Sequence, residues 1–388
     1  MLEAIKRACR KPLLNFLRRK NLFSDHGPLR GVLSLDAWLN SSSGAGQILR
    51  RDSGLPEPGS RLLPPTSGDS FEIEKRSLLH ANTFVAELHG ALFYGPSVAV
   101  ITPDRYLLWE LSMEFGHPSE NHGAMRRLWF PKPKHLRGTW ALLAVTGGNT
   151  YYHHLLEVLP KAHLLRQAGL DPAKVDGVIV SGMRHAFQKD SWKILGLNPQ
   201  KVHSLERGGI WEAERLIVTS PPSHAGSSPR WATDFVRGLF LQDSSPPSTG
   251  ERLYLSRAGE QTRRFLDEEA LWPELQKRGF CKFTPQGRSL KEQAHRFAGA
   301  SCLVGPHGGA FTNSVFCQQR TRILELLNPR YLNPCYQNLA LALGVIPSFF
   351  IGDKIAGDKK SRPADSKGDI HLEPKTRELF LRELDKLC

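Results

Sequence analysis

The sequence predicts an α/β protein built from two Rossmann-like domains that face a cleft. Three observations support this fold class. Short apolar runs alternate with helical stretches, the alternation breaks at 243–250, and it restarts in the same form beyond the break. Because alternating strands and helices fold as strand–helix–strand units, each half is expected to form a largely parallel sheet.

The chain length also favours two domains, since 388 residues are too many for one ordinary core. We expect a basic N-terminal segment and a Ser/Gly/Pro-rich linker over 1–70, an α/β domain over 71–242 and a second one over 250–351. A loop and a C-terminal helix are expected over 352–388.

In the N-terminal domain, apolar runs predict strands at 98–101, 106–109, 140–145, 176–181 and 215–218. Helices are predicted at 151–168, which Gly169 ends, and at about 184–195. The stretch 40–70, which is rich in Ser, Gly and Pro, predicts a loop.

The C-terminal domain repeats the alternation. Strands are predicted at 252–256, 280–284, 301–305, 322–327 and 345–351. Helices are predicted at 267–278 with Asp267 as N-cap, at about 289–299 and 334–343, and briefly after the turn at 306–309. Beyond a polar loop at 352–373, an apolar stripe predicts a helix over 374–387, formed by Leu379, Phe380, Leu384 and Leu387.

The composition limits the partners. The chain has 52 Lys and Arg against 38 Asp and Glu, a net charge of +14, which indicates an anionic partner. Nucleic acid is disfavoured because the basic residues are spread out and no nucleic-acid-binding motif occurs. The six cysteines include no C-x-x-C pair, so we expect neither a disulfide framework nor a zinc site, but thiols in a reducing compartment.

Residues 1–20 interleave apolar side chains with seven Lys and Arg. They lack the apolar core of a signal peptide, and no window of the chain approaches the roughly 18 apolar residues of a spanning helix. Two interpretations stay open: a basic amphipathic helix on an anionic membrane, or a solvated start, since Pro12 would interrupt one long helix. We therefore expect a cytoplasmic protein, peripheral at the inner face of the membrane under the first interpretation.

His153 and Glu157 form the candidate catalytic pair. Their spacing of four residues places them on one helix face. A carboxylate beside an imidazole can orient the ring and raise its basicity, as in a general base with its partner. An ordinary surface His–Glu pair is the alternative.

Two other segments have features of a phosphate site. In 305–313 (G-P-H-G-G-A-F-T-N), glycines after a predicted strand open a helix, so backbone N–H groups could approach an anion. Arg257 ends another strand, where a guanidinium can hold a diphosphate bidentately. An ordinary turn and a solvated basic loop are the alternatives. The chain has no D-x-D motif to support a metal-bridged diphosphate.

Taken in order, these segments resemble glycosyltransferase family 61, also known as capsular polysaccharide biosynthesis proteins. The first family motif reads like Y-H-W-L-L-E-V-L-P and is matched at 152–160, with His154 in place of Trp. The second reads like Y-L-S-R and is matched at 254–257, with basic and acidic residues after it and an E-Q pair at 292–293. The third reads like V-G-x-H-G-A-G-L-T-N and is matched at 304–313, before the E-L at 325–326.

The resemblance covers about 140–350 and implies an inverting transferase with a GT-B-like fold. The missing D-x-D motif, together with Arg257, His307 and the helix start, predicts that it needs no metal. The 71–242 domain would hold a glycan or lipid-linked glycan acceptor, with His153 and Glu157 as the catalytic residues. The 250–351 domain would bind a nucleotide sugar, with no metal or other cofactor. The implied donor-binding residues are Ser256, Arg257, Arg263, His307, Gly308, Gly309, Thr312, Asn313 and Glu325, the last through the ribose.

The implied setting is the synthesis of surface polysaccharide, such as capsule, or of glycoconjugates. The main alternative is a non-catalytic nucleotide- or glycan-binding protein of the same fold. An epimerase would need a dinucleotide fingerprint, which the chain lacks, and a nucleic-acid binder is the third alternative.

Overall fold

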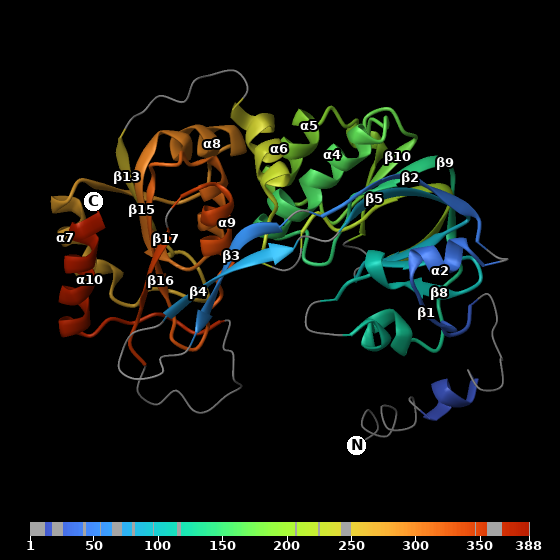
Figure 1. Ribbon diagram of the computed structural model, residues 1–388, viewed down its shortest axis with the longest axis horizontal. Coiled ribbons are helices and arrows are strands. Elements are labelled where there is room, and N and C mark those ends of the chain that lie inside the picture. The colour runs from blue at the N-terminus through green and yellow to red at the C-terminus, as the bar shows by residue number, and fades with distance from the viewer. Residues whose placement is uncertain are drawn as a thin grey trace. The chain divides into compact units, whose positions relative to one another are not determined.

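The chain folds into two compact units: unit 1 comprises residues 1–54 and 81–222, and unit 2 comprises 55–80 and 223–388. Figure 1 shows their helices and strands. The computed structural model describes residues 12–17, 26–41, 44–54, 56–63, 72–79, 82–95, 97–114, 118–205, 208–223, 226–241, 250–345, 347–354 and 367–387. Most of the basic segment 1–20, all but one residue of the break at 243–250 and the middle of the loop at 352–373 lie outside these residues. Within the segment 1–20, residues 12–17 are helical.

Within the residues that the structure describes, unit 1 contains a ten-stranded mixed sheet. Its parallel part runs in the order β12-β9-β10-β11, with β12 Gly209–Thr219, β9 Lys134–Leu142, β10 Gly177–Val180 and β11 Val202–Ser204. The other strands are β1 Gly31–Leu33, β2 Gly46–Asp52, β5 Thr83–His89, β6 Leu92–Gly95, β7 Ala99–Ile101 and β8 Tyr106–Leu108. The expectation of a largely parallel sheet is wrong for this unit, because β5 and β6 pair antiparallel with β12 and β2 pairs antiparallel with β5.

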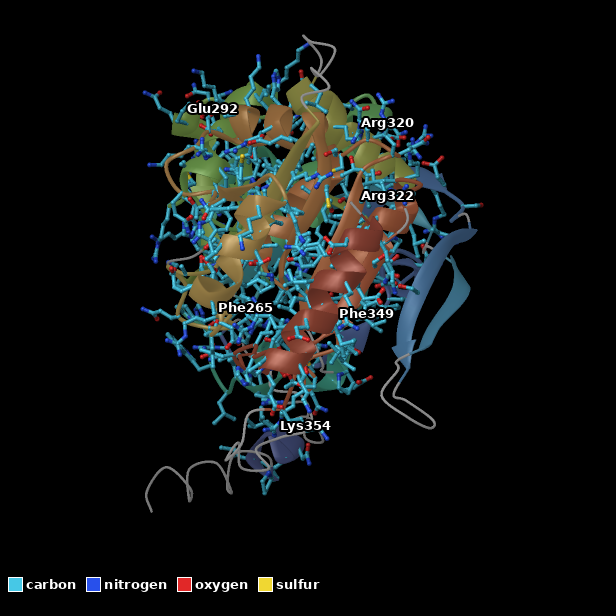
Figure 2. The ribbon with its side chains drawn as sticks, turned by 90° about the vertical axis from the view of Figure 1, so that its left-hand side faces the viewer. Phe265, Glu292, Arg320, Arg322, Phe349 and Lys354 are labelled. Carbon is cyan, nitrogen blue, oxygen red and sulfur yellow. The ribbon has the colours of Figure 1, made fainter. Side chains whose placement is uncertain are left out.

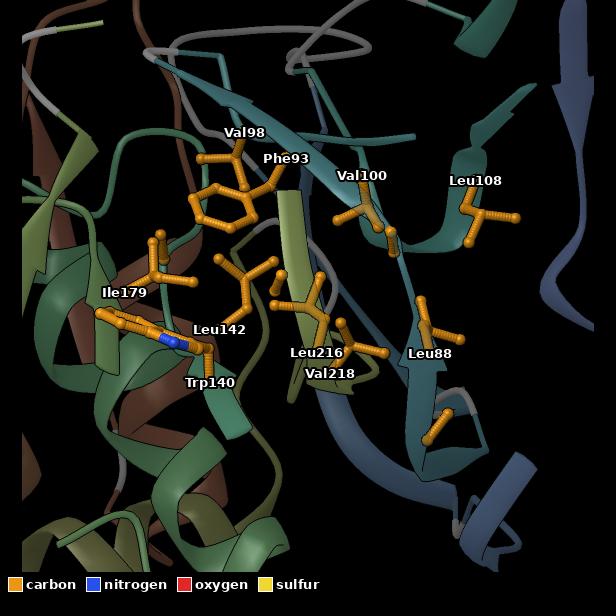
Figure 3. Close-up of a cluster of buried hydrophobic side chains, with 14 of the residues drawn as sticks. Leu88, Phe93, Val98, Val100, Leu108, Trp140, Leu142, Ile179, Leu216 and Val218 are labelled. Atoms are coloured by element: carbon orange, nitrogen blue, oxygen red, sulfur yellow. The ribbon is translucent and has the colours of Figure 1, made fainter. Parts of the chain in front are cut away.

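One face of this sheet buries an apolar cluster that includes Phe93, Leu142, Ile179 and Leu216 (Figure 3). Trp140 lies at its border and pairs across the strands with Gly177. A Cβ at Gly177 would overlap the Trp140 ring, so this position needs glycine to let the two strands pair. The short helices of the unit are α2 Leu35–Leu39, η1 Trp109–Leu111, η2 Ser119–Asn121, η3 Gly123–Arg126, α5 Ala186–Ile194 and η5 Pro199–Lys201.

The predicted helix at 151–168 is confirmed, but its second turn is not α-helical. It consists of α3 Tyr151–His153, the π-helix η4 His154–Val158 and α4 Leu159–Gln167. The amide of Leu159 donates to the carbonyl of His154, five residues back. We attribute this wide turn to Pro160, which has no N–H to donate and whose ring would clash with the carbonyl of Leu156 in a regular α-helix. A left-handed Gly169 follows the end of the helix, as predicted.

The described part of unit 2 contains a five-stranded sheet whose pairings are all parallel. Its order is β14-β13-β15-β16-β17, with β13 Glu251–Leu255, β14 Phe280–Phe283, β15 Ala300–Pro306, β16 Arg322–Leu327 and β17 Pro347–Ile351. These strands confirm all five predicted for this half. The first strand therefore lies between the second and the third, and the chain changes direction across the sheet between β13 and β15. In parallel α/β sheets, ligands bind at such a switch point, beyond the carboxyl ends of the strands.

Helices cover both faces of this sheet. In Figure 1, α7 Glu268–Lys277 and α10 Pro374–Leu387 lie on one face, and α8 Leu290–Gly299 and α9 Cys335–Ala342 on the other. The unit also contains α6 Arg230–Leu241 and the 3-10 helix η7 Gly309–Phe316. On α10, Phe380 and Leu384 are buried, but the prediction for Leu379 is wrong because its side chain is exposed. Asp267 does not cap α7 with its side chain, which accepts instead from the ring of His371 and the amide of Leu372.

The predicted loop at 40–70 is wrong. Besides β2, it contains β3 Pro56–Leu63, which pairs antiparallel with β4 Glu72–Leu79. This hairpin belongs to unit 2, where β3 lies beside α9 (Figure 1). The amide and hydroxyl of buried Ser60 both donate to Asn338 Oδ1, over 2.6 and 3.0 Å. The residue that β3 contacts is thus distant in the sequence. Local sequence patterns do not reveal such a long-range contact.

The cysteines only partly follow the expectation. Cys281, Cys317 and Cys335 are thiols. Cys302 is disulfide-bonded, and its partner is not among the described residues. The interpretation of all six cysteines as thiols is therefore wrong for Cys302. Cysteine usage thus no longer supports a reducing compartment.

Candidate functional site

The carboxyl ends of β13 and β15 bring Arg257 against Gly308 in unit 2. The Arg257 guanidinium is held by the backbone: Nε donates to the carbonyl of Arg263 (3.0 Å) and Nη2 to that of Thr262 (2.8 Å). Nη1 lies over Gly308, where any Cβ would overlap it. The described residues give Nη1 no hydrogen-bond acceptor, so this nitrogen is placed to donate to a ligand at the switch point.

Electrostatics make this arginine a strong anion ligand. Burial lowers the pKa of Arg257, and repulsion from Arg263 adds to this effect. The carboxylate of Glu260 lies 3.9 Å from Nη2, too far for a hydrogen bond. A negatively charged ligand would relieve both the desolvation and the repulsion, so the two arginines favour binding of phosphate groups.

His307 follows β15 directly and is buried beside these arginines. Its Nδ1 hydrogen-bonds to Glu325 Oε1, and Glu325 Oε2 accepts from Gln337 Nε2. Both oxygens of the buried Glu325 are thus engaged within the protein. The predicted contact of Glu325 with a ribose stays a prediction, whereas the geometry supports a positioning role: the carboxylate orients the His307 ring and leaves Nε2 for a ligand.

Aromatic rings surround this imidazole. The ring centroids of Tyr331 and Tyr336 lie 5.3 and 5.0 Å from that of His307. The guanidinium of Arg263 lies over the Tyr331 ring, 5.7 Å from its centroid. Arg263 has a positive φ of 52°, which is unusual for a residue with a side chain. The sequence reading missed both tyrosines and Gln337, because no motif or spacing linked them to His307.

The remaining predicted donor residues make contacts of other kinds. Ser256 Oγ donates to buried Glu268, over 2.6 Å, and Tyr254 also donates to this carboxylate. Thr312 and Asn313 are fully buried in η7, and Asn313 Nδ2 donates to Gln293 on α8. Gly309 begins η7, and a Cβ there would meet open space. The structure therefore groups Arg257, Arg263, His307, Gly308 and Glu325. Ser256 and Asn313 hydrogen-bond instead to α7 and α8, and Thr312 is buried in η7.

In unit 1, His153 and Glu157 face each other across the π turn. His153 Nδ1 lies 2.9 Å from Glu157 Oε1, with the side chains 24% and 10% exposed. The lower exposure of the imidazole distinguishes this pair from an ordinary surface pair such as His89–Glu87, whose histidine is 51% exposed although its carboxylate is only 8% exposed. The prediction that the two residues share a helix face is confirmed.

The same helix carries a third charged residue close to this pair. Lys161 lies four residues beyond Glu157, is buried, and directs Nζ at the carbonyls of Leu142 (3.4 Å) and Ala144 (3.3 Å). Burial lowers its pKa to about 8, and the charge of Glu157 opposes that shift. The sequence reading missed Lys161, although its spacing of four from Glu157 is visible in the sequence.

His154, the departure from the family motif, is an internal packing residue. It is fully buried, and its ring meets those of Phe187 and Trp192 edge-on at 5.2 and 4.9 Å. Burial lowers its pKa to about 3, so the ring is neutral at physiological pH. It occupies the place of an aromatic side chain rather than that of a catalytic one.

A cavity of about 150 Å³ lies where the parallel strands of unit 1 end. Gly147, Gly148, Asn149, Ser181 and Arg184 contribute to its lining. Gly147 has a φ of 75°, and a Cβ at Gly148 would overlap Ser181. The two glycines thus fold the loop tightly before the helix that carries His153, and polar groups are left facing the cavity.

No described helix combines the length and apolar character needed to cross a membrane. Within the described ranges, no three His, Cys, Asp or Glu side chains are grouped to hold a metal ion. Metal independence stays a prediction.

The family comparison matches residues 151–324 to the model named Glycosyltransferase 61. This stretch begins at the helix of His153 and ends in β16, so it includes both motif regions described above. No curated protein matches the chain. The match bears out the predicted resemblance over residues 151–324, and this family points to glycosyltransferase activity with a sugar donor and a glycan acceptor.

Proposed function

We propose that this chain, whose residues 151–324 belong to glycosyltransferase family 61, transfers a sugar from a nucleotide-sugar donor to a glycan or lipid-linked glycan acceptor. The observation that carries the proposal is the cluster of Arg257, Gly308 and His307 at the switch point of a parallel sheet. The finer parts of the proposal are inversion, metal independence, a GT-B-like organisation and a role in surface polysaccharide or glycoconjugate synthesis.

In the proposed reaction, the acceptor oxygen attacks the anomeric carbon as the bond from that carbon to the donor phosphate breaks. The acceptor proton passes to a base, and the nucleotide leaves with the electron pair of the broken bond. A single displacement of this kind inverts the anomeric carbon and passes through an oxocarbenium-like transition state. It therefore needs a base and a means of stabilising the negative charge of the leaving phosphate.

Unit 2 supplies the second requirement. Arg257 Nη1, the backbone amides at 308–309 and, in the doubly protonated form of the ring, His307 Nε2 are the donors we assign to the leaving phosphate. They are fixed before the reaction by the Thr262 and Arg263 carbonyls and by Glu325. Donors that need no reorganisation stabilise developing charge effectively, which removes the need for a metal.

Unit 1 supplies the base. His153, whose Nδ1 lies 2.9 Å from Glu157 Oε1, is the group we assign to the acceptor hydroxyl. An imidazole has a suitable basicity near neutral pH, and the adjacent carboxylate stabilises the imidazolium that forms. Either member of the pair could take the proton, and the reaction balances in both cases.

The experiment is a panel of nucleotide sugars tested against the full chain by thermal shift and by product formation. A ligand at one hundred times its Kd stabilises the folded state by about 2.7 kcal/mol, so a true donor should stand out. A nucleotide sugar that binds and is transferred supports the proposal. Binding without transfer to any glycan, and without hydrolysis, would instead favour the non-catalytic binding protein.

A further inference from the structure

A second basic cavity lies in unit 2, outside the cluster just described. Its volume is about 440 Å³, and its lining consists of Arg230, Arg237, Cys317, Gln318, Gln319, Arg320 and Leu343. Three of the seven lining side chains are guanidiniums and two are amides, and none of these lining residues carries a carboxylate. The cavity therefore presents mainly hydrogen-bond donors with positive charge.

The two helix arginines are positioned by defined contacts. Arg237 Nη1 donates to the carbonyls of Val315 and Cys317, both at 2.7 Å. Arg230, seven residues earlier on α6, pairs with Asp234 at 2.9 Å. A spacing of seven residues places both guanidiniums on one face of the helix. Burial lowers the pKa of Arg237, and repulsion from Arg230 contributes to this shift.

The cavity lies at the edge of the sheet away from the donor cluster. Cys317–Arg320 lead into the start of β16 at Arg322, and Leu343 precedes the start of β17 at Pro347. The donor cluster follows the ends of β13 and β15. In Figure 2, Arg320 and Arg322, at the amino-terminal end of β16, lie well above Lys354, which follows the carboxyl-terminal end of β17.

We infer that this cavity binds a phosphate group in addition to the proposed donor. Asp234 offsets part of the charge of Arg230, so a net positive charge of about two remains for an anion. Guanidiniums match the geometry of phosphate oxygens, and the amides of Gln318 and Gln319 can add neutral hydrogen bonds. The phosphate could belong to a soluble metabolite or to a lipid headgroup, and both sources share this chemistry.

The test is calorimetric titration of the full chain with inorganic phosphate at low ionic strength. It is performed in the Arg257→Ala background, so that the donor cluster does not contribute. Adding Arg320→Gln should weaken binding about tenfold, since a charge-assisted hydrogen bond is lost. Arg320 is exposed, so this substitution spares the core. Arg382→Gln, also exposed but on α10, is the matched control and should change nothing.

A second variant protects the test against loss of structure. Asp234→Asn removes the carboxylate beside Arg230 and should tighten phosphate binding about threefold, an effect that damage to the fold cannot imitate. The proposal is overturned if the Arg257→Ala chain binds no phosphate, or if the Arg320 and Asp234 variants both bind it as their parent does.

Vesicles distinguish the two sources. Full chains carrying Arg320→Gln or Arg382→Gln are sedimented with phosphatidylglycerol vesicles and with neutral phosphatidylcholine vesicles. A loss confined to Arg320→Gln and to the anionic vesicles assigns the site to a lipid headgroup. Equal sedimentation of both variants, with phosphate binding still lost in Arg320→Gln, assigns it to a soluble phosphate. Both results support a phosphate site.

Discussion

The His153–Glu157 pair and Arg257 should separate into two kinetic classes. His153→Ala or Glu157→Gln should lower kcat by about 10²–10⁴-fold with donor affinity retained, because base catalysis acts in the transition state. Arg257→Ala should also weaken donor binding, by roughly 10- to 100-fold, because the diphosphate is present in the ground state. Donor affinity and single-turnover rates measure the two effects.

His89→Ala is the control for these variants, since this histidine also lies against a glutamate, at 2.7 Å, but is exposed. It should retain full turnover. If the two motif variants behave like this control, the pair is structural and the base lies elsewhere.

Lys161 should tune the base through Glu157 without contacting substrate. Replacing it by Met removes a buried cation that interacts with the charge of Glu157, and a nearby cation favours the deprotonated form of a catalytic group. We expect Lys161→Met to move the acidic limb of the pH–rate profile to higher pH, and Lys161→Arg to restore it. A lower kcat with an unmoved profile in Lys161→Met would assign Lys161 to packing alone.

His154 should make folding sensitive to acid. Its pKa is lowered to about 3 in the folded chain, against 6.5 as its ordinary value. Between these values only the unfolded chain binds the proton. The stability is therefore complete above pH 6.5 and is lost as pH falls toward 3. From pH 7 to pH 5 the loss amounts to about 2 kcal/mol.

His154→Phe should abolish that part of the acid sensitivity while keeping the aromatic contacts with Phe187 and Trp192. Urea unfolding at pH 7 and pH 5 measures the difference, and His89→Phe, at an exposed ring, should keep the wild-type dependence. The same acid loss in His154→Phe and in wild type would show that another group titrates.

At the level of elements, the π turn is the feature most open to test. Pro160→Ala restores an N–H group at position 160, so the backbone hydrogen bonds can form as in a regular α-helix. Removing one residue from the wide turn would rotate the residues before it by about 100° relative to α4. The alignment of His153 with Glu157 and the packing of His154 would both change. We expect a folded protein with reduced turnover and an altered near-ultraviolet signal from Trp192.

Pro199→Ala offers a matched control, because Pro199 lies in the first turn of η5, where a missing N–H costs nothing. It should leave both measurements unchanged. Wild-type turnover in Pro160→Ala would show that the π turn has a cause other than the proline.

Predictability from sequence also differed between elements. The strands of unit 2 were identified closely because a parallel sheet covered on both faces produces continuous apolar runs. β3 was missed because Pro56, Pro58 and Gly59 resemble a linker, and its stabilising contact is with Asn338. Similarly, the glycines in 305–313 indicated an anion site in the sequence. Only the structure shows that Gly308 leaves space for the Arg257 guanidinium. Long-range partners of this kind leave no periodic signal.

For the whole molecule, turnover should not depend on a divalent cation. The reason is that Arg257, His307 and backbone amides are assigned to the charge a metal would otherwise neutralise. Activity in excess chelator should equal that in buffer, with a metal-dependent transferase assayed in parallel as control. Loss of activity that magnesium or manganese restores would contradict the assignment of the leaving-phosphate site.

The position of the β3–β4 hairpin also affects the order in which unit 2 can fold during synthesis. The hairpin leaves the ribosome early, yet the helix that receives it, α9, begins only at Cys335. At about 5–20 residues per second, synthesis from Leu79 to Cys335 takes roughly 10–50 s. A two-stranded hairpin is at best marginally stable alone, so during this interval its edges are open to other nascent chains. Unit 2 therefore cannot be completed before α9, Cys335–Ala342, has been translated, and until then the unpaired hairpin is a segment that a chaperone could protect.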